Sequence, residues 1–502
     1  MDENVFKTCL YKTRKLIEPT VTESPKIKET TFFRALLPVL FLLILLVYGL
    51  IVRPLVFKQP AFPLEIVFIL SAAFAVTVLF WMGHEWEAIQ HSIVQKLAKA
   101  IPAFFILFAI GLIISSWMIC GTIPMLVYYG IKIINPTFLY VLAFLVPVVF
   151  SSLTGTSWGS VGTIGVVIIG ISGAVGGDAG ITAGAVIGGA YFGDKLSPLS
   201  DTTNLAALAA EVDLFDHIQS MLITTIPSAV LATILFFALG FIYPPAQNAM
   251  STASGVQFLE ALHSIFNFNI ALLLPPVIVL YGSIKKKPPI PTLITSVLAA
   301  ALLALIFQNY TISDVVQSLY KGYHTDMATW VANVPESVAT LTNRGGLYAL
   351  NEAITIAFMI FIYIGAIDHI NAMSIVVHRI FFFAKSRATT ILASLLATAI
   401  TNSMTSNQYA TSFVVGDAFL SKYDEMKIPR KVLSRSLEDT GTMLESVVPW
   451  TTTSVFMVAT LGVPWADYWH WQLLSLINFI VAPTLAILGI GCFYHEIDQK
   501  GK

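Results

Sequence analysis

Charged residues are scarce along the whole of this chain, at 11% of 502 residues, against about 25% in an ordinary soluble protein. Cysteine is scarcer still, and Cys9, Cys120 and Cys492 lie too far apart to form a metal motif or a disulfide framework. The net charge of −1 offers no basic surface for nucleic acid. These absences exclude a soluble fold and a nucleic-acid partner. Together with the 56% of hydrophobic residues, these absences predict an all-α protein that crosses a lipid bilayer many times. No cofactor is expected.

Apolar runs long enough to cross a bilayer, at about 20 residues each, recur along the sequence. Eight are nearly uninterrupted: 33–56, 61–82, 101–131, 218–244, 265–284, 289–307, 347–381 and 470–493. Two more, 180–212 and 436–463, contain proline and polar residues and are expected to be broken helices. Another two, 137–172 and 388–420, have polar middles at Ser151–Ser160 and Thr401–Ser412, which indicates re-entrant hairpins. The prediction is about ten transmembrane helices plus two hairpins.

The distribution of Lys and Arg predicts the orientation of these spans. Basic residues collect in the leader and in the connections that a ten-span arrangement places on the leader's side, so both termini are expected in the cytoplasm and the protein in the cell membrane. The predicted division of the chain is a leader at 1–32, two spans in 33–82, a first repeat in 83–244, linking spans in 245–307, a second repeat in 308–493 and a tail at 494–502. The segment Glu85–Ala100 is expected to form either a helix on the cytoplasmic surface or an ordinary connecting helix.

Residues of the first half can be paired with residues of the second half that lie a fixed number of positions further along the chain. This fixed difference in residue number, called the repeat shift, pairs Asp194 with Glu445. The same repeat shift aligns other polar and helix-breaking positions: Thr154 with Thr405, Trp158 with Tyr409, Pro198 with Pro449 and Thr202 with Thr453. Five crossings separate the two broken helices, so the helices run in opposite directions through the membrane. This pattern predicts an inverted-topology duplication, an architecture found in many secondary transporters.

The run Gly189–Asn204 holds the strongest candidate site residues. Asp194 and Asp201 are carboxylates in an apolar stretch, and Lys195 is the sole basic residue between Lys132 and Lys285. Charge and a broken helix at membrane depth mark a solute or proton pathway. Lys195 is expected either to neutralise one of the two aspartates or to compete for it when a bound cation leaves.

The second half supplies further acidic candidates. Glu445 occupies the position equivalent to Asp194, and Glu438 and Asp439 lie a turn or two earlier. The latter two are interpreted either as coupling residues or as partners of Arg435 near the cytoplasmic surface. Asp368 and His369, in the middle of the run 347–381, are interpreted as a satisfied buried pair or a proton relay.

Oxygen-bearing side chains around the two polar tips and the two helix breaks complete the predicted site. Together with Lys195, the candidate substrate ligands are Thr154, Thr156, Ser157, Ser197, Thr202, Thr405, Asn407, Gln408, Thr451 and Thr452. Hydroxyls and freed backbone carbonyls suit hard cations. The alternative is that these groups only join helices to one another by hydrogen bonds.

At these residues the chain resembles the NhaC family of sodium/proton antiporters. The motifs that carry the resemblance are SWMICGTIPMLVYYG (116–130), TGTSWGSVGTIG (154–165), GAYFGDKLSPLSDTTNLA (189–206), LSRSLEDTGT (433–442) and PWTTT (449–453). The resemblance implies exchange of Na⁺ against H⁺ without ATP, with the acidic and hydroxyl residues of these motifs as the coupling groups. The chain departs from the family pattern at Thr451, where an amide is expected, at Glu445, an extra carboxylate, and at Asp417.

The sequence therefore predicts a secondary active transporter that works by alternating access. The hypothesis is that Na⁺ and H⁺ compete for a midplane site built on Asp194, Asp201 and Glu445, with Thr154 and Thr405 as further Na⁺ ligands. The alternative is a sodium- or proton-coupled exchanger of small organic acids or amino acids, with Lys195 and a helix N-terminus holding the anion. An enzyme is disfavoured because the HExxH motif is missing. The lipid bilayer and a second copy in a homodimer complete the expected partners.

Overall fold

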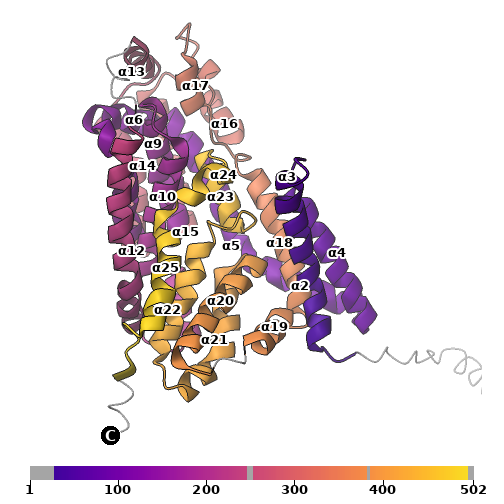
Figure 1. Cartoon of the computed structure of the whole chain (residues 1–502). Helices are drawn as coiled ribbons and strands as arrows, with labels where there is room; N and C mark the ends of the chain where they lie inside the picture. The colour runs from indigo at the N-terminus through magenta and orange to yellow at the C-terminus, as the bar shows by residue number, and fades with distance from the viewer. Residues whose placement is uncertain (1–27, 246–252, 382–384, 496–502) are drawn as a thin grey trace, which may run out of the picture.

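The computed structural model describes residues 28–245, 253–381 and 385–495, and every regular element in these ranges is a helix (Figure 1). The leader up to residue 27, with Cys9, lies outside the described residues. Within the described residues, eight helices are long and apolar enough to cross a membrane, or up to ten when two bent helix pairs are counted as one span each. The expectation of an all-α polytopic membrane protein is confirmed.

An N-terminal group of helices packs against one helix of the second half. Phe68 of α4 contacts Tyr363 of α18, and Ile93 of α5 lies against Gly365 of α18. The group consists of α2 (Phe32–Leu46), η1 (Val47–Val52), α3 (Arg53–Leu55), α4 (Leu64–Met82), α5 (Trp86–Ile119) and α18 (Asn351–Asp368). Buried residues of α2, α4, α5 and α18 belong to one hydrophobic cluster, which continues into residues 372–437 and so joins the group to the second half of the chain.

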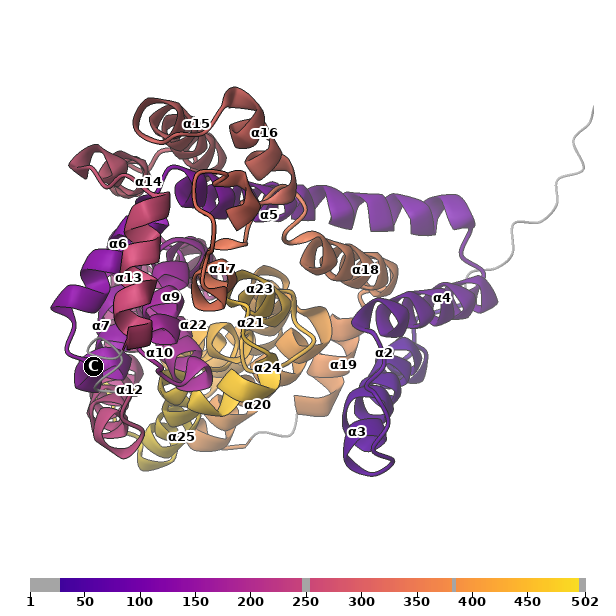
Figure 2. The same ribbon diagram turned by 90° about the horizontal axis from the view of Figure 1, so that it is seen from above.

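The predicted span 101–131 and the segment before it are arranged differently from the expectation. Helix α5 is continuous over 34 residues (Figure 2), so Glu85–Ala100 forms no separate surface helix. Ile89 and Ile93 are buried because they face the protein interior. The helix ends at Ile119, just before Gly121, whose φ of 88° is left-handed, and α6 (Thr122–Ile133) begins after this glycine in a new direction.

The first predicted hairpin is present. Its first arm is η2 (Pro136–Phe138) with α7 (Leu139–Thr154), and its second arm is α8 (Ser157–Ser160), η3 (Val161–Gly165) and α9 (Val166–Ala174). The Tyr140 hydroxyl accepts a hydrogen bond from the Asp178 backbone N–H (2.9 Å) and donates one to the Tyr243 carbonyl (3.1 Å). The two ends of the hairpin therefore lie together, at the level where α10 (Ala179–Leu196) begins and α12 (Leu214–Ile242) ends.

The second hairpin enters from the opposite end of the molecule. It consists of α20 (Arg387–Thr405) and α21 (Gln408–Glu425), and Arg387 Nε donates to the Met426 carbonyl (3.1 Å), which joins its two ends. Helix α22 (Arg430–Thr440) begins beside them. His217, at the start of α12, is 2.7 Å from Ser434 Oγ on α22. Because α12 runs the length of the molecule between the two ends, the two hairpins are inverted relative to each other.

The helix bounds of the two repeats agree with the repeat shift that the sequence predicts. Helices α8 to α9 cover 157–174 and α21 covers 408–425; α10 begins at 179 and α22 at 430. After each break, α11 (Asp201–Ala209) corresponds to α23 (Thr452–Leu461). The register is thus confirmed from 136 to 209 and from 387 to 461, whereas the wider repeat boundaries stay a prediction.

The run 347–381 is divided where one predicted span was expected. Asn371, with a φ of 49°, separates α18 from α19 (Ala372–Phe381). Asp368 and His369 therefore lie at a helix end rather than in mid-span. Asp368 forms an ion pair with Lys96, and His369 Nε2 is 3.0 Å from His84 Nδ1. Burial lowers the pKa of both histidines, so each is expected to be neutral at pH 7.

The remaining helices close the two ends of the molecule and one side of it. They are α13 (Ala253–Ile265), η4 (Ile270–Leu273), α14 (Leu274–Ile284), α15 (Pro289–Phe307), α16 (Ile312–Lys321), η5 (Thr325–Met327), α17 (Glu336–Thr342), η6 (Thr442–Leu444), α24 (Trp465–Tyr468), η7 (Trp469–Trp471) and α25 (Leu473–Leu488). Figure 1 shows α13, α16 and α17 at one end of the molecule and α21 at the other.

Candidate functional site

The two hairpin tips have the same construction. Gly155 and Ser406 turn the chain in the left-handed region, with φ of 68° and 49°. The next residue, Thr156 or Asn407, caps the following helix by accepting the backbone N–H three residues on. The preceding threonine is also bonded within its own tip, Thr154 to Ser160 (3.2 Å) and Thr405 to Thr411 (3.0 Å). The polar sequence at each tip therefore folds first of all upon itself.

Each tip lies beside the break in its own repeat's broken helix. A Cβ on Gly155 would stand 2.6 Å from Leu199, in the link between α10 and α11. In the second repeat, the Thr452 hydroxyl donates to the carbonyl of Ser406 at the tip (3.1 Å). Four helices, α8, α11, α21 and α23, begin at this junction, and Thr156, Ser200, Asn407 and Thr451 cap them. Their positive N-terminal ends stabilise negative charge there.

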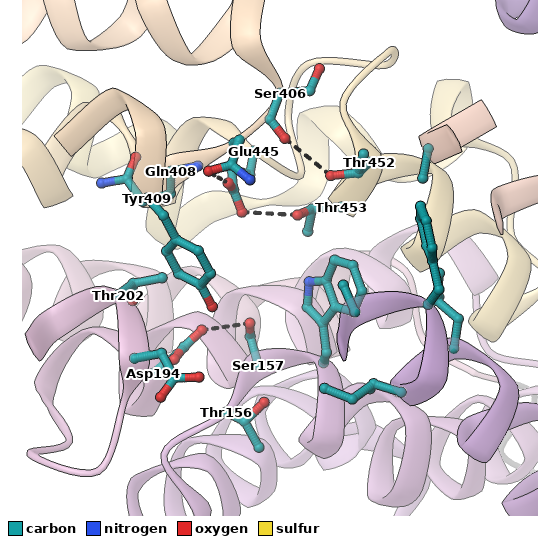
Figure 3. Close-up of a pocket in the computed structure, with 18 of the residues that line it drawn as sticks. Thr156, Ser157, Asp194, Thr202, Ser406, Gln408, Tyr409, Glu445, Thr452 and Thr453 are labelled. Carbon is teal, nitrogen blue, oxygen red and sulfur yellow. Dashed lines mark hydrogen bonds between the residues drawn. The ribbon is translucent and has the colours of Figure 1, made fainter. Parts of the chain in front are cut away.

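A cavity of about 170 Å³ lies where the tips and breaks of the two repeats meet (Figure 3). Its polar lining residues are Thr156, Ser157, Asp194, Asp201, Thr202, Ser406, Asn407, Gln408, Tyr409, Glu445, Thr452 and Thr453, and its apolar wall contains Phe104, Leu107, Trp158 and Phe361. No lysine, arginine or histidine of the described residues lines it. The cavity therefore collects carboxylates without any cationic side chain.

One carboxylate from each repeat is held at the cavity by neutral hydrogen-bond donors. Asp194 accepts from the hydroxyls of Ser157 (2.6 Å) and Ser200 (2.7 Å). Glu445 accepts from the backbone N–H of Gln408 (3.0 Å) and the hydroxyl of Thr453 (2.8 Å). In each case one donor comes from the hairpin tip and the other from the broken helix. The two acids thus occupy equivalent places, as the repeat shift predicts.

Asp201 lies at the boundary with a second cavity. This cavity, of about 500 Å³, shares Ile106, Gly155, Thr156 and Asp201 with the first and extends to Lys286 and Lys287, between α14 and α15. Asp201 is solvent-exposed, unlike Asp194. The shared residues place the second cavity, called the vestibule, next to the first on the side of the lysine-rich end of the molecule.

Lys195 lies outside both cavities. It is fully buried, and its ammonium forms an ion pair with Asp439 on α22 rather than with Asp194 or Asp201. Asp439 also accepts from Thr224 (2.8 Å) and Asn478 (3.2 Å), and its other oxygen is 3.8 Å from Arg435 Nε. The expectation that Lys195 neutralises an aspartate of its own repeat is wrong. The alternative expectation, that Asp439 pairs with Arg435, agrees with the structure.

Comparison with known proteins identifies the family of the chain. The model of the Na⁺/H⁺ antiporter family matches residues 189–490, which include one broken helix and the entire second hairpin. The chain belongs to the Na⁺/H⁺ antiporter family. An uncharacterized Na⁺/H⁺ antiporter of Haemophilus influenzae is 37% identical over 463 residues, covering 92% of this chain and 97% of that protein. The Na⁺/H⁺ antiporter NhaC of Alkalihalophilus pseudofirmus is 33% identical, covering 86% and 91%. A malate-2H⁺/Na⁺-lactate antiporter of Bacillus subtilis is 30% identical, covering 85% and 88%.

Several predicted ligands of this family member are not part of the cavity. Thr154 lines only the vestibule, and Thr405 is bonded inside its tip, so Asp194, Asp201, Thr154 and Thr405 do not form a single cation site. Ser197 donates to the Ser152 carbonyl (3.2 Å). Thr451 caps α23 and bonds the Glu445 carbonyl. Glu438 is buried behind the cavity. For the hydroxyls of Thr405, Ser197 and Thr451, the structure agrees better with the alternative expectation that they only join segments to one another by hydrogen bonds.

Thr156, Ser157, Thr202, Asn407, Gln408 and Thr452 do line the cavity, as predicted. Sequence reasoning missed Ser200, Tyr409 and Thr453. The repeat shift identifies two of them: it aligns Thr453 with Thr202 and Tyr409 with Trp158, both residues of the first repeat's site. Ser200 had a local signal, since a serine just before Asp201 at the start of a helix is a typical N-cap.

Proposed function

We propose that the chain is a secondary active transporter that exchanges Na⁺ for H⁺ across the cell membrane by alternating access. One observation carries the proposal: Asp194 and Glu445, one from each inverted repeat, line the same cavity with only neutral donors around them. Two carboxylates in a low-dielectric site need positive charge, which either a bound cation or protons supply. Competition between the two is the basis of exchange.

The same geometry provides oxygen ligands for Na⁺. Besides the carboxylates, the hydroxyls of Thr202 and Thr452 and the side chain of Asn407 line the cavity. Hard cations take such carboxylate, hydroxyl and carbonyl oxygens. Asp201 at the vestibule is proposed as the first carboxylate that an entering cation meets. The vestibule would open to the cytoplasm if the lysine-rich end faces inward, as the positive-inside rule predicts.

The test uses purified protein in liposomes that contain a pH-sensitive dye. Addition of Na⁺ is expected to move protons in the opposite direction, and Li⁺ and K⁺ added separately give the cation preference. Asp194→Asn and Glu445→Gln should each abolish Na⁺-driven proton movement, because each removes one of the two negative charges for which Na⁺ and protons compete. Glu425→Gln, at an exposed acid that pairs with Lys422, is the control. Full exchange by both cavity variants would contradict the proposal.

A second candidate, exchange of a small organic acid, is favoured by the apolar wall of the cavity. Phe104, Trp158 and Phe361 could cover a short carbon skeleton, and a relative is named a malate-2H⁺/Na⁺-lactate antiporter. Lys195 is not available to bind the anion, so the acid would have to enter with Na⁺ or protons bound at the carboxylates. Uptake of labelled malate or lactate against an unlabelled pool, in vesicles that show no exchange with Na⁺ alone, would select this function.

A further inference from the structure

Behind the cavity, α22 brings three ionisable side chains into the interior within five residues. Arg435, Glu438 and Asp439 are each at most 2% exposed, and Lys195 of α10 reaches the same place with no exposed surface. Asp439 forms an ion pair with each of the two cations: it lies at hydrogen-bonding distance from the Lys195 ammonium and at 3.8 Å from Arg435 Nε. Two buried cations therefore share one carboxylate, which leaves this cluster one positive charge in excess.

Glu438 is the acid of the cluster that shares no ion pair. It has no exposed surface, its carboxylate oxygens form no hydrogen bond of ordinary geometry with any described residue, and the hydroxyl of Thr442 is a donor close to it. It lines neither the cavity nor the vestibule. It lies eight residues into α22, or about 12 Å from the start of that helix. An ionised carboxylate buried in this way is costly without compensation, and a protonated one is tolerated.

The first repeat shows that the fold does not require an acid at this place. The repeat shift aligns Glu438 with Ile187 of α10, a fully buried apolar residue. It also aligns Asp439 with Gly188 and Arg435 with Gly184. The buried charged residues of α22 are therefore an addition made by one repeat only. Such an asymmetric carboxylate without an ion pair, at membrane depth, points to a role in transport rather than in folding.

We propose that Glu438 binds a further proton that the transporter exchanges for Na⁺, at a place separate from the cation cavity and in addition to the protons that compete for the cavity carboxylates; this deepens the Na⁺/H⁺ exchange proposed above and rests on it. Both forms of Glu438 are tolerated, for different reasons. When ionised, it offsets the excess positive charge of Lys195 and Arg435. When protonated, it avoids the cost of an unpaired buried anion.

Electrostatics then couples the two sites. Lys195 and Asp194 of α10, and Glu445 after η6, are the charged groups that act on Glu438 from the facing elements; Arg435 and Asp439 flank it on α22. His217 of α12, which is bonded to Ser434, and Tyr423 of α21, which is beside Ser436 and Arg435, lie against the same helix. A Na⁺ ion at Asp194 and Glu445 and a proton on Glu438 both add positive charge to one low-dielectric region, so each disfavours the other. This mutual exclusion is the requirement for antiport.

The experiment compares two readouts on the same proteoliposomes. Exchange of radioactive Na⁺ for unlabelled Na⁺ requires the cavity but no proton, whereas Na⁺-driven movement of protons requires both. Glu438→Gln is expected to keep the Na⁺–Na⁺ exchange of the wild type and to lose the share of proton movement that Glu438 carries. Glu438→Asp, which keeps a carboxylate at this position, should restore part of the Na⁺-driven proton movement. Glu438→Ile, which installs the residue of the first repeat, should be folded and behave like Glu438→Gln.

A measurement on the unmodified protein makes the test independent of any variant. A lipid-soluble carbodiimide reacts with protonated carboxyl groups, and mass spectrometry of the digested protein reports the modification at Glu438. Na⁺ added at constant pH is expected to reduce it, because the bound cation expels the proton. Labelling that does not respond to Na⁺, Na⁺/H⁺ exchange by Glu438→Gln at the wild-type rate, or loss of both readouts in a folded Glu438→Gln, would each overturn the assignment. Absence of Na⁺-driven proton movement in the wild type would instead refute the proposed function itself.

Discussion

At the scale of single residues, the site is defined by which oxygens remain free after the local backbone has been satisfied. Thr154, Thr405 and Thr451 have hydroxyls of the right kind in the right segments, but their hydrogen bonds are used within tips and caps. Ser157 and Ser200 point instead at Asp194. A hydroxyl in a polar motif is thus a ligand for the carboxylate only where its O–H is not already donated within the tip or the break; the Ser200 oxygen accepts the Thr203 N–H as the cap of α11 and still donates to Asp194.

Ser200 provides a direct test of this distinction. Its hydrogen bond to Asp194 is charge-assisted and is worth about 1.5–3 kcal/mol, so Ser200→Ala should raise the Na⁺ concentration for half-maximal exchange about tenfold or more. The matched control is Ser197→Ala, in the same link, where the lost bond goes to the Ser152 carbonyl. The measurement is exchange rate against Na⁺ concentration at fixed pH. An unchanged half-maximal concentration in Ser200→Ala, or an equal rise in Ser197→Ala, would show that the bond to Asp194 does not position it for Na⁺.

Lys195 shows why sequence proximity misled the prediction of an ion pair. Adjacent residues of an α-helix project about 100° apart, so Lys195 and Asp194 cannot both face the first hairpin tip. Asp194 faces Ser157, and Lys195 faces α22 and α12, where Asp439 and Thr224 lie. The sequence identified both residues as functional candidates correctly. Ser157 lies 37 residues from Asp194, and Asp439 lies 244 residues from Lys195 in the other repeat, so finding these two partners required the fold.

At the scale of helices, the close approach of α7 and α10 fixes the first tip against its broken helix. A Cβ on Gly189 would stand 2.1 Å from the Phe144 carbonyl oxygen, and one on Gly193 would stand 2.1 Å from the Ser152 backbone nitrogen. Backbone atoms cannot rotate away as a side chain can. The glycines of the motif 189–206 therefore set the separation of two helices, and through it the position of Asp194 at the end of α10.

Gly189→Ala is expected to destabilise the protein by about 1–3 kcal/mol, since the added methyl group must push α7 away from α10. Gly173→Ala is the control, because a Cβ there meets no atom within 4 Å in α9. In a helix, alanine replaces glycine with a gain of about 0.5–1 kcal/mol, so this variant should be equally or more stable. Thermal unfolding of the detergent-solubilised variants measures both. Equal unfolding temperatures would indicate that α7 and α10 can separate without cost.

The segment before Pro102 illustrates a limit on predicting helices from periodicity. Trp86, Ile89 and Ile93 recur at helical spacing, and the spacing is the same whether the helix lies on a membrane or continues into a span. The structure continues it, because Ile93 contacts Gly365 of α18 and the helix gains a buried face there. The helical state was predictable from the sequence, but the choice between the two environments depends on a helix in the other half of the chain.

At the scale of the whole molecule, the repeat shift was the most productive sequence observation. It depended on polar and helix-breaking positions rather than on overall similarity, and those are the positions that form the tips, caps and breaks. Consequently the register, the opposed hairpins and the equivalence of Asp194 and Glu445 were all predictable. The charged residues that α22 adds behind the cavity break the symmetry, so no comparison of the halves could assign Glu438 or Asp439 to a partner.

The orientation of the ten proposed spans can be tested from the two ends of α5. Helix α5 starts beside the α18 end that carries Asp368 and finishes at Cys120, whose carbonyl accepts from Gln308 at the end of α15. Gln59, between α3 and α4, lies at the end of the molecule where α5 finishes. Lys285, between α14 and α15, lies at the end where α5 starts. The test uses a variant in which Cys9, Cys120 and Cys492 are replaced. In intact cells, Gln59→Cys should react with a membrane-impermeant maleimide. Lys285→Cys should react only after the membrane is opened, because basic connections are retained in the cytoplasm. The opposite pattern would invert the proposed topology and make the vestibule an outward-facing entrance. Labelling of both cysteines in intact cells would mean that the chain crosses the membrane an even number of times between residues 59 and 285, which would contradict the arrangement proposed here.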